Sequence, residues 1–332
     1  MSSLRRATYA LACALFVTAA GCASSSSAVP SVSVAPAPSE TAAPAIARSS
    51  GPRPTVVGPS DRIDVAYASV STAERLDVHL PPIGAGPFPV VVWIHGGGWD
   101  RGDRGLSAAG PQQGLLSAGY AVVSVDYRLS AEAVFPAQID DIKAAIRFVR
   151  AHTADFNLDT TRIGVWGDSA GGQLAALAGT SGDIAAFDDV ALGNIDRSSR
   201  VQAVVDWYGP SSFSTMDEQF ATDGCAKRVA PLSSVESRLL GASVATRGDL
   251  AAAASPVTYV STDDPPFFIE HGKADCMVPW QQSDELATQL RSSIGEAHVS
   301  LTLLDNAGHG GAAFTAKPNV ALVVAFFDAH LR

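Results

Sequence analysis

A serine between glycines stands near the middle of the chain, in the segment GDSAG at residues 167–171. The segment fits the pattern G-x-S-x-G, in which a serine hydroxyl is exposed on a sharp turn between a strand and a helix. A strand-like run, RIGVWG over 162–167, precedes it directly, and a helix-like run of small residues over 169–178 follows. This context predicts that Ser169 is a nucleophile, whereas an ordinary Gly-Ser loop would lack the two flanking elements.

A second glycine-rich segment, HGGGW at residues 95–99, follows a predicted buried strand. Attack by a serine on an acyl group creates an oxyanion, which is stabilised by backbone N–H groups that point at one position. Glycines expose such groups without an interfering Cβ. We expect the N–H of Gly97, of Gly98 or of both, together with that of Ala170, to form the oxyanion hole, with His95 bracing the loop. A phosphate-binding loop is the alternative, but its known glycine spacings are absent here.

The serine also needs a base, and the base needs an acceptor that fixes its tautomer. Among the seven histidines, His309 is the one in a glycine-rich loop, AGHGG, between the last predicted strand and the last predicted helix. Asp275 follows another predicted strand, so we assign His309 as the base and Asp275 as the acid.

Three neighbouring residues are assigned other roles. Asp305, four residues before His309, is the main rival acid and is interpreted as a strand-end carboxylate. Asp168 adjoins the serine, but its place on the turn predicts a structural side chain that points away. His271 ends a predicted strand and is assigned a positioning role.

The elements that must hold these residues alternate along the chain from residue 60 onward. Predicted strands cover 62–68, 76–80, 88–95, 120–127, 162–167, 201–207, 266–271 and 299–304. Predicted helices cover 106–118, 137–151, 169–178, 281–291 and 317–331. Near-continuous apolar runs are typical of strands covered on both faces, whereas the first two strands alternate weakly and suggest an antiparallel edge. The pattern predicts an α/β, mostly parallel, doubly wound sheet with helices on both faces, interrupted by a small insertion near 211–256.

Two aromatic residues are expected near the same edge of the sheet. Trp99 follows the oxyanion glycines, and Tyr208 follows the predicted strand 201–207. Ligands of such sheets bind outside the carboxyl ends of the strands. Both side chains are therefore expected to line the substrate pocket; burial in the core is the alternative.

The N-terminus has the pattern of an export signal. Two arginines precede an apolar run of 14 residues over 7–20, which is shorter than the ~20 residues of a membrane-spanning helix. Residues 1–21 are therefore predicted to be a signal peptide. The small residues before Cys22 resemble a bacterial lipobox, which implies that Cys22 is lipidated and that the protein faces outward from a cell membrane. Secretion after ordinary cleavage and an uncleaved anchor are the alternatives.

The segment after Cys22 differs in composition from the rest of the chain. Of the 32 residues in 23–54, 23 are Ala, Ser or Pro, a composition that cannot bury enough apolar surface to fold. We predict a disordered tether over 22–54 and a catalytic domain over 55–332.

The charge and the number of cysteines indicate which partners and which compartment to expect. With 23 basic and 33 acidic residues, the net charge of −10 argues against nucleic acid as a partner and leaves membrane contact only to the N-terminal lipid. Two cysteines, Cys225 and Cys276, remain in the folded region of an exported chain, which suggests a disulfide; two buried free thiols are the alternative.

Six motifs together carry a family resemblance. They are HGGGW, VDYRL, FPAQIDDIKAAIRFVRA, RIGVWGDSAGG, HGKADCMVP and AGHGG. They resemble the α/β-hydrolase superfamily, and within it the bacterial feruloyl-esterase-like (BD-FAE) and hormone-sensitive-lipase-like esterases, over about residues 60–332. The order Ser169, Asp275, His309 is that of α/β-hydrolases. Many hormone-sensitive-lipase relatives carry an N-terminal helical cap where this chain has a low-complexity tether, so the feruloyl-esterase-like branch and a more open site are favoured.

The resemblance implies a serine carboxylic-ester hydrolase that acts on small or carbohydrate-linked acyl esters through an acyl-enzyme, with no metal or organic cofactor. A hydrolase of amide or peptide bonds with the same triad is the second hypothesis. A non-catalytic binding module with this fold is the third, although such proteins usually lose the serine or the histidine.

Overall fold

The computed structural model describes residues 58, 61–223, 225 and 234–332. The predicted signal peptide, Cys22 and the predicted tether lie outside the described residues. Within the described part, no helix is long and apolar enough to cross a membrane.

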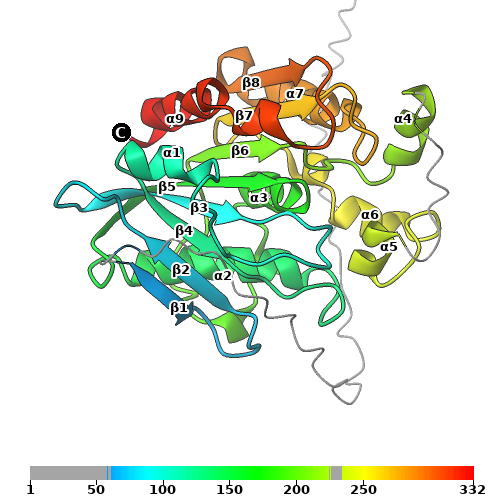
Figure 1. Cartoon of the computed structure of the whole chain (residues 1–332). Helices are drawn as coiled ribbons and strands as arrows, with labels where there is room; N and C mark the ends of the chain where they lie inside the picture. Colours follow the sequence, from blue (N-terminus) through cyan, green and yellow to red (C-terminus); the bar gives the residue numbers. More distant parts are fainter. Residues whose placement is uncertain (1–57, 59–60, 224, 226–233) are drawn as a thin grey trace, which may run out of the picture. The chain divides into compact units, whose positions relative to one another are not determined.

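An eight-stranded sheet forms the centre of the described structure (Figure 1). Its strands are β1 Arg62–Ala66, β2 Arg75–His79, β3 Phe88–Ile94, β4 Ala121–Val125, β5 Leu158–Asp168, β6 Ala203–Trp207, β7 Phe267–Gly272 and β8 Val299–Leu304. Their order is β1-β2-β4-β3-β5-β6-β7-β8. The contacts of β2 with β1 and β4 are antiparallel, and all other neighbours are parallel. The predicted parallel sheet with an antiparallel edge is confirmed.

The apolar strands are buried on both faces, as their sequences predict. In β3, Val90 and Val92 enter one hydrophobic core, whereas Val91 and Trp93 enter the other. The alternation follows from the two-residue period of a strand. A strand with helices on both faces therefore needs apolar side chains at every position.

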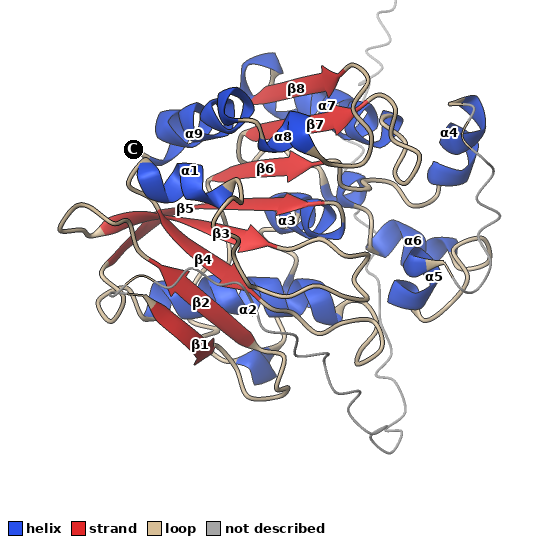
Figure 2. Cartoon of the chain, in the orientation of Figure 1, coloured by secondary structure: helices blue, strands red, loops and turns tan. Residues whose placement is uncertain are grey.

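Helices cover both faces of the sheet (Figure 2). The α-helices are α1 Gln112–Ser117, α2 Ala137–Ala151, α3 Ala170–Thr180, α4 Met216–Thr222, α5 Val235–Leu240, α6 Gly248–Ala253, α7 Gln281–Ile294, α8 Ala312–Thr315 and α9 Lys317–Leu331. Short 3₁₀ turns lie at Ala185–Phe187, Val190–Leu192, Pro256–Tyr259 and Glu296–His298. Buried side chains of α2, α3 and α7 belong to one core, and those of α1 and α9 to the other.

Helix α1 is shorter than the predicted helix 106–118. It begins only after Pro111, which is its N-cap residue, because a proline is best tolerated at a helix start. Leu106 is nevertheless buried in the core. The apolar pattern before Pro111 therefore reports burial of a loop and not helix formation.

The predicted insertion near 211–256 contains α4, α5 and α6. In Figure 1 these helices lie toward the end of the sheet at which the arrowheads of β3, β5 and β6 point. The carboxyl ends of parallel strands are where such sheets bind ligands. The insertion is thus placed to contribute to a site there.

Candidate active site

The serine of the GDSAG segment lies on a strained turn between β5 and α3. Ser169 has φ 54° and ψ −120°, a conformation that non-glycine residues adopt rarely and mostly at functional sites. A Cβ on Gly171 would collide with the main-chain carbonyl of Ile94 in β3. Glycine at this position therefore lets α3 begin close against the sheet while the serine projects beyond the strand end.

Three loops bring the predicted catalytic residues together. His309, in the loop after β8, has its Nε2 2.8 Å from Ser169 Oγ. Its Nδ1 lies 2.6 Å from Asp275 Oδ2, in the loop after β7. A serine, histidine and carboxylate linked in this order can pass the serine proton to the imidazole and stabilise the cation that forms.

The carboxylate of Asp275 is buried and has many hydrogen-bond partners. Its Oδ1 accepts the N–H groups of Met277 at 2.7 Å and Val278 at 3.0 Å. Its Oδ2 also lies 3.2 Å from His271 Nε2. Burial alone would raise the pKa of Asp275, but the hydrogen bonds from His271 and His309 outweigh it and hold the pKa well below its ordinary value. Asp275 is therefore negatively charged wherever His309 has to act as a base.

His271 has the positioning role that the sequence indicated. It is fully buried, and its Nδ1 lies 2.7 Å from Ser283 Oγ in α7. Its Nε2 lies 3.0 Å from the main-chain oxygen of Val278. The imidazole thus connects the acid's loop to the helix that follows it.

The rival acid does not reach the histidine. Asp305 forms an ion pair with Lys273 at 3.0 Å, and its side chain is 76% exposed.

The prediction that Asp168 points away from the site is wrong. Its Oδ1 accepts the N–H of Gly96 at 2.9 Å, and the residue lines the same cavity as the serine. Asp168 is the last residue of β5, next to the end of β3, so its side chain meets the loop that follows β3. Burial raises the pKa of Asp168, and the hydrogen bond from Gly96 opposes that shift. Its role is to hold the glycine loop, so the structural part of the prediction stands.

The glycine loop after β3 has the backbone that the sequence predicts. Gly97 and Gly98 have φ angles of 116° and 61°, which residues with a Cβ rarely adopt. His95 is buried, its Nδ1 lies 2.7 Å from the Gly96 oxygen, and its ring stacks on Tyr127. Tyr127 in turn donates to the His95 oxygen at 2.9 Å. His95 therefore braces the loop, as expected.

The predicted oxyanion-hole residues share one cavity with the serine. Gly97, Gly98 and Ala170 line it together with Ser169 and His309. Ala170 is the first residue of α3, where a backbone N–H has no acceptor inside the helix. The arrangement can present backbone donors beside the nucleophile.

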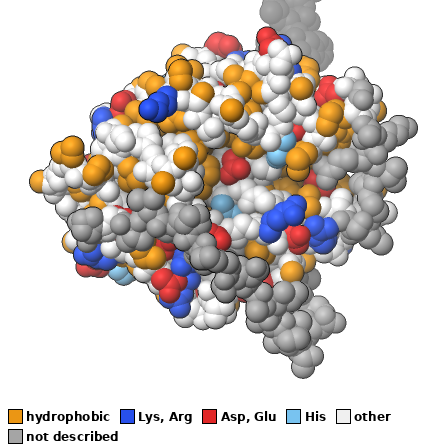
Figure 3. All heavy atoms as spheres, viewed as in Figure 1, with side chains coloured by type: hydrophobic (Ala, Val, Ile, Leu, Met, Phe, Trp, Pro, Cys, Tyr) orange, Lys and Arg blue, Asp and Glu red, His pale blue; other side chains and the backbone are white. Residues whose placement is uncertain are grey.

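The cavity has a volume of about 660 Å³ and opens on the face shown in Figure 3. Trp99 and Tyr208 line it, as predicted, and both are also largely buried, at 2% and 7% exposure. Trp99 donates its Nε1 hydrogen to Gln173 Oε1 at 3.0 Å. The Tyr208 ring lies 4.7 Å from the His309 ring, centroid to centroid. The two aromatics are thus core residues with one side turned to the site.

Sequence reasoning missed further residues of the cavity wall. Val235 and Glu236 reach it from α5 in the insertion, and Met277 and Arg101 reach it from loops. Arg101 could have been found, because it lies two residues after HGGGW. Val235 and Glu236 had no comparable sequence signal, since their position at the cavity depends on how α5 packs against the rest of the protein.

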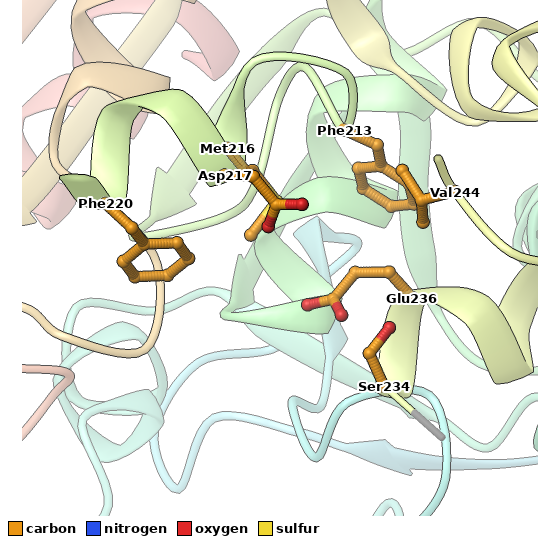
Figure 4. Close-up of a pocket in the computed structure, with 7 residues that line it drawn as sticks. All are labelled: Phe213, Met216, Asp217, Phe220, Ser234, Glu236 and Val244. Atoms are coloured by element: carbon orange, nitrogen blue, oxygen red, sulfur yellow. The ribbon is translucent and has the colours of Figure 1, made fainter. Parts of the chain in front are cut away.

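A second, much smaller cavity lies beyond Glu236, which lines both (Figure 4). The other residues that line it are Phe213, Met216, Asp217, Phe220, Ser234 and Val244. Its volume of about 10 Å³ is that of a single water molecule at most. It offers no room for part of a substrate.

The insertion is tied to the acid's loop by a disulfide between Cys225 and Cys276. The predicted pairing is confirmed, and the alternative of two free thiols is wrong. Cys276 follows Asp275 directly and lines the cavity. The bond therefore restrains the loop that carries the acid.

Comparison with known proteins identifies the family. The model of the BD-FAE family matches residues 76–290, which include the glycine loop, the serine turn and Asp275. This chain belongs to the BD-FAE family. His309 lies beyond the matched residues, so its assignment depends on the geometry above.

Relatives and solved structures agree with this family. "Probable carboxylic ester hydrolase LipM" of Mycobacterium tuberculosis is 32% identical over 230 residues, which are 69% of this chain and 51% of that protein. The structure titled "Truncated form of carbohydrate esterase from gut microbiota" has a TM-score of 0.74 and 30% identity, over 84% of this chain and 98% of that one. A bifunctional GH43-CE protein of Bacteroides eggerthii has a TM-score of 0.72 and 32% identity, and the match covers 82% of this chain and 36% of that one. These similarities show the α/β-hydrolase fold; the chain spans about half the length of the curated relatives it matches.

Proposed function

We infer that the protein is a serine carboxylic-ester hydrolase that cleaves small or carbohydrate-linked acyl esters through an acyl-enzyme. The observation that carries the inference is the continuous hydrogen-bonded chain Ser169–His309–Asp275, which opens into a cavity beside the backbone of Gly97 and Gly98.

The first half of the reaction is acylation. His309 Nε2 accepts the Ser169 proton as Oγ attacks the ester carbonyl, and Asp275 stabilises the imidazolium. The N–H groups of Gly97 or Gly98 and of Ala170 stabilise the oxyanion. The tetrahedral intermediate collapses as His309 gives the proton to the departing alcohol. The acyl group then remains on Ser169.

The second half is deacylation by water. His309 takes a proton from the water, the hydroxyl adds to the acyl carbon, and the second tetrahedral intermediate releases the carboxylic acid as Ser169 regains its proton.

Carbohydrate-linked esters are favoured by the similarity to a structure titled as a carbohydrate esterase. The cavity volume of about 660 Å³ is within the range of small-molecule sites, so it fits an acyl group and a small alcohol or sugar unit better than a lipid with long chains.

The test is hydrolysis of p-nitrophenyl esters from acetate to palmitate by the protein and by Ser169→Ala. Activity that is highest on short acyl chains and absent from the variant supports the proposal. A folded protein without activity on the series, but reactive with a fluorophosphonate probe at Ser169, would favour amide or peptide substrates. Absence of both activity and labelling would favour the binding module.

We also propose export, with the catalytic domain held outside a bacterial membrane by a lipid on Cys22. The support is the sequence of residues 1–22 and a disulfide, a bond typical of oxidising compartments. Metabolic labelling with a radioactive fatty acid should mark the protein and not Cys22→Ser. An unlabelled protein found in the medium would favour secretion.

A further inference from the structure

Among the described residues, Arg101 is the only lysine or arginine that lines the cavity. Arg101 lies in the loop that also carries the glycines Gly97 and Gly98, and it is exposed to solvent. The protein as a whole carries a net charge of −10. The cavity that contains the nucleophile thus holds a positive side chain, although the protein as a whole is negatively charged.

Arg101 makes no hydrogen bond or ion pair with another described residue. The charged neighbours are engaged elsewhere. Asp100, next to it in the chain, pairs with Arg238 at 3.1 Å, and Asp168 accepts the N–H of Gly96. Glu236, across the cavity, is buried and has its own partner. The Arg101 guanidinium is thus available to a bound molecule.

The main chain at Arg101 is nevertheless held in place. A Cβ on Gly97 would collide with the Arg101 carbonyl, so the two backbones are packed together. The turn between them is closed by the Asp100 N–H, which donates to the Gly97 oxygen at 3.3 Å. The side chain therefore starts from a fixed point beside the oxyanion glycines, while its guanidinium can adjust.

A guanidinium matches a carboxylate through two parallel hydrogen bonds. We propose that Arg101 is a specificity residue that binds a carboxylate on the substrate, so that the preferred esters carry a negative charge on the acyl group or on the alcohol. Uronic-acid esters and half-esters of dicarboxylic acids are the chemical classes that fit. This proposal rests on the esterase function proposed above and specifies its substrate class.

The test compares esters that differ in one charge. On the acyl side, p-nitrophenyl hydrogen glutarate is compared with p-nitrophenyl valerate. On the alcohol side, 4-acetoxybenzoate is compared with its methyl ester. For each pair the ratio of kcat/KM, charged over neutral, is measured for the wild type, Arg101→Gln and Arg101→Lys after subtraction of spontaneous hydrolysis.

We expect the ratio for one of the pairs to fall about tenfold in Arg101→Gln, the effect of losing a partly solvated charged hydrogen bond. Arg101→Lys should retain part of the ratio, and salt should lower the ratio in the wild type. The pair that responds shows on which side of the ester the charge is bound.

Arg247→Gln is the matched control, because Arg247 is an exposed arginine in an ion pair with Asp249 and does not line the cavity. It removes the same charge and should leave both ratios as in the wild type. Equal ratios in wild type and Arg101→Gln, or an equal fall in Arg247→Gln, would overturn the proposal. Hydrolysis of the neutral esters tests the esterase function separately, so its failure is distinguishable from failure of the carboxylate site.

Discussion

Two buried aspartates at the ends of neighbouring strands behave in opposite ways. Asp275, after β7, receives hydrogen bonds from two backbone N–H groups and two histidines, and its pKa lies well below the ordinary value. Asp206, in β6 beneath the serine turn, accepts one N–H from Gly209 at 2.9 Å, and its Oδ2 has no partner. Burial raises the pKa of Asp206 to about 7, and the hydrogen bond from Gly209 only partly opposes it.

The comparison shows that burial alone does not decide whether a carboxylate is charged. Desolvation opposes the charge in both places, and the number of hydrogen-bond donors decides which effect is larger. The donors are concentrated on the residue whose charge the proposed mechanism uses. Variants at these two aspartates and at their neighbours test this difference.

The largest effect is expected for Asp275→Asn. The amide cannot stabilise the imidazolium of His309 and favours the wrong tautomer, so kcat should fall by about 10⁴. Steady-state kinetics on p-nitrophenyl acetate measures it. Asp305→Asn is the control and should be as active as the wild type; a large loss there, with an active Asp275→Asn, would reverse the assignment of the acid.

Loss of the disulfide should loosen the loop that carries Asp275, because Cys276 is the next residue in the chain, and should leave the hydrogen bond of Asp206 unchanged. Cys225→Ser opens a loop with a sequence separation of 51 residues, which lowers the free energy of unfolding by about 4 kcal/mol on the chain-entropy model. Activity should fall as well, because the acid's loop loses its restraint. Urea unfolding and kinetics measure both effects. A fully active and equally stable variant would show that the bond does not position the loop.

Asp206→Asn should change how stability depends on pH. The pKa of Asp206 is raised in the folded protein above the unfolded value of about 4, so the wild type loses stability from this group as the pH rises from about 4 to about 7. The variant lacks that loss and should become more stable than the wild type, by a few kcal/mol, above pH 7. Urea unfolding at pH 5 and pH 8 gives the comparison. A stability difference that is the same at both pH values would show that Asp206 does not titrate in this range.

The smallest effect is expected for His271→Asn. The variant removes one of the donors that hold the Asp275 carboxylate in place, so kcat at pH 8 should fall about tenfold or less. Steady-state kinetics on p-nitrophenyl acetate is the readout, and a fully active variant would show that this donor does not help to position Asp275. Ser283→Ala, which removes the other partner of His271, should lower kcat by less.

The sequence alone predicts most of the scaffold. The apolar runs from Phe88 to Ile94 and from Ala121 to Val125 identify buried parallel strands, because a strand covered on both faces needs apolar residues at every position. The prediction of a helix from residue 106 was wrong before Pro111, because the buried Leu106 lies in a loop. Apolar periodicity reports burial, and a loop packed on the core has the same composition as a short helix.

The candidate catalytic residues were assigned from local patterns. Ser169 and the glycines of HGGGW needed special backbone conformations, and such conformations demand particular residue types at fixed spacing. His309 and Asp275 were assigned from their place after predicted strands. The direction of the Asp168 side chain was not predictable, since it depends on how β5 lies beside β3.

The sequence by itself therefore determined the order of strands and helices, the serine turn, the glycine loop and the family, because each depends on residues that are neighbours in the chain. Only the tertiary structure decided which charged groups meet. Asp275 receives hydrogen bonds from four donors and Asp206 from one, and Arg101 finds no acceptor among the described residues. Coulomb energy and desolvation depend on those distances, which residue spacing along the chain does not fix.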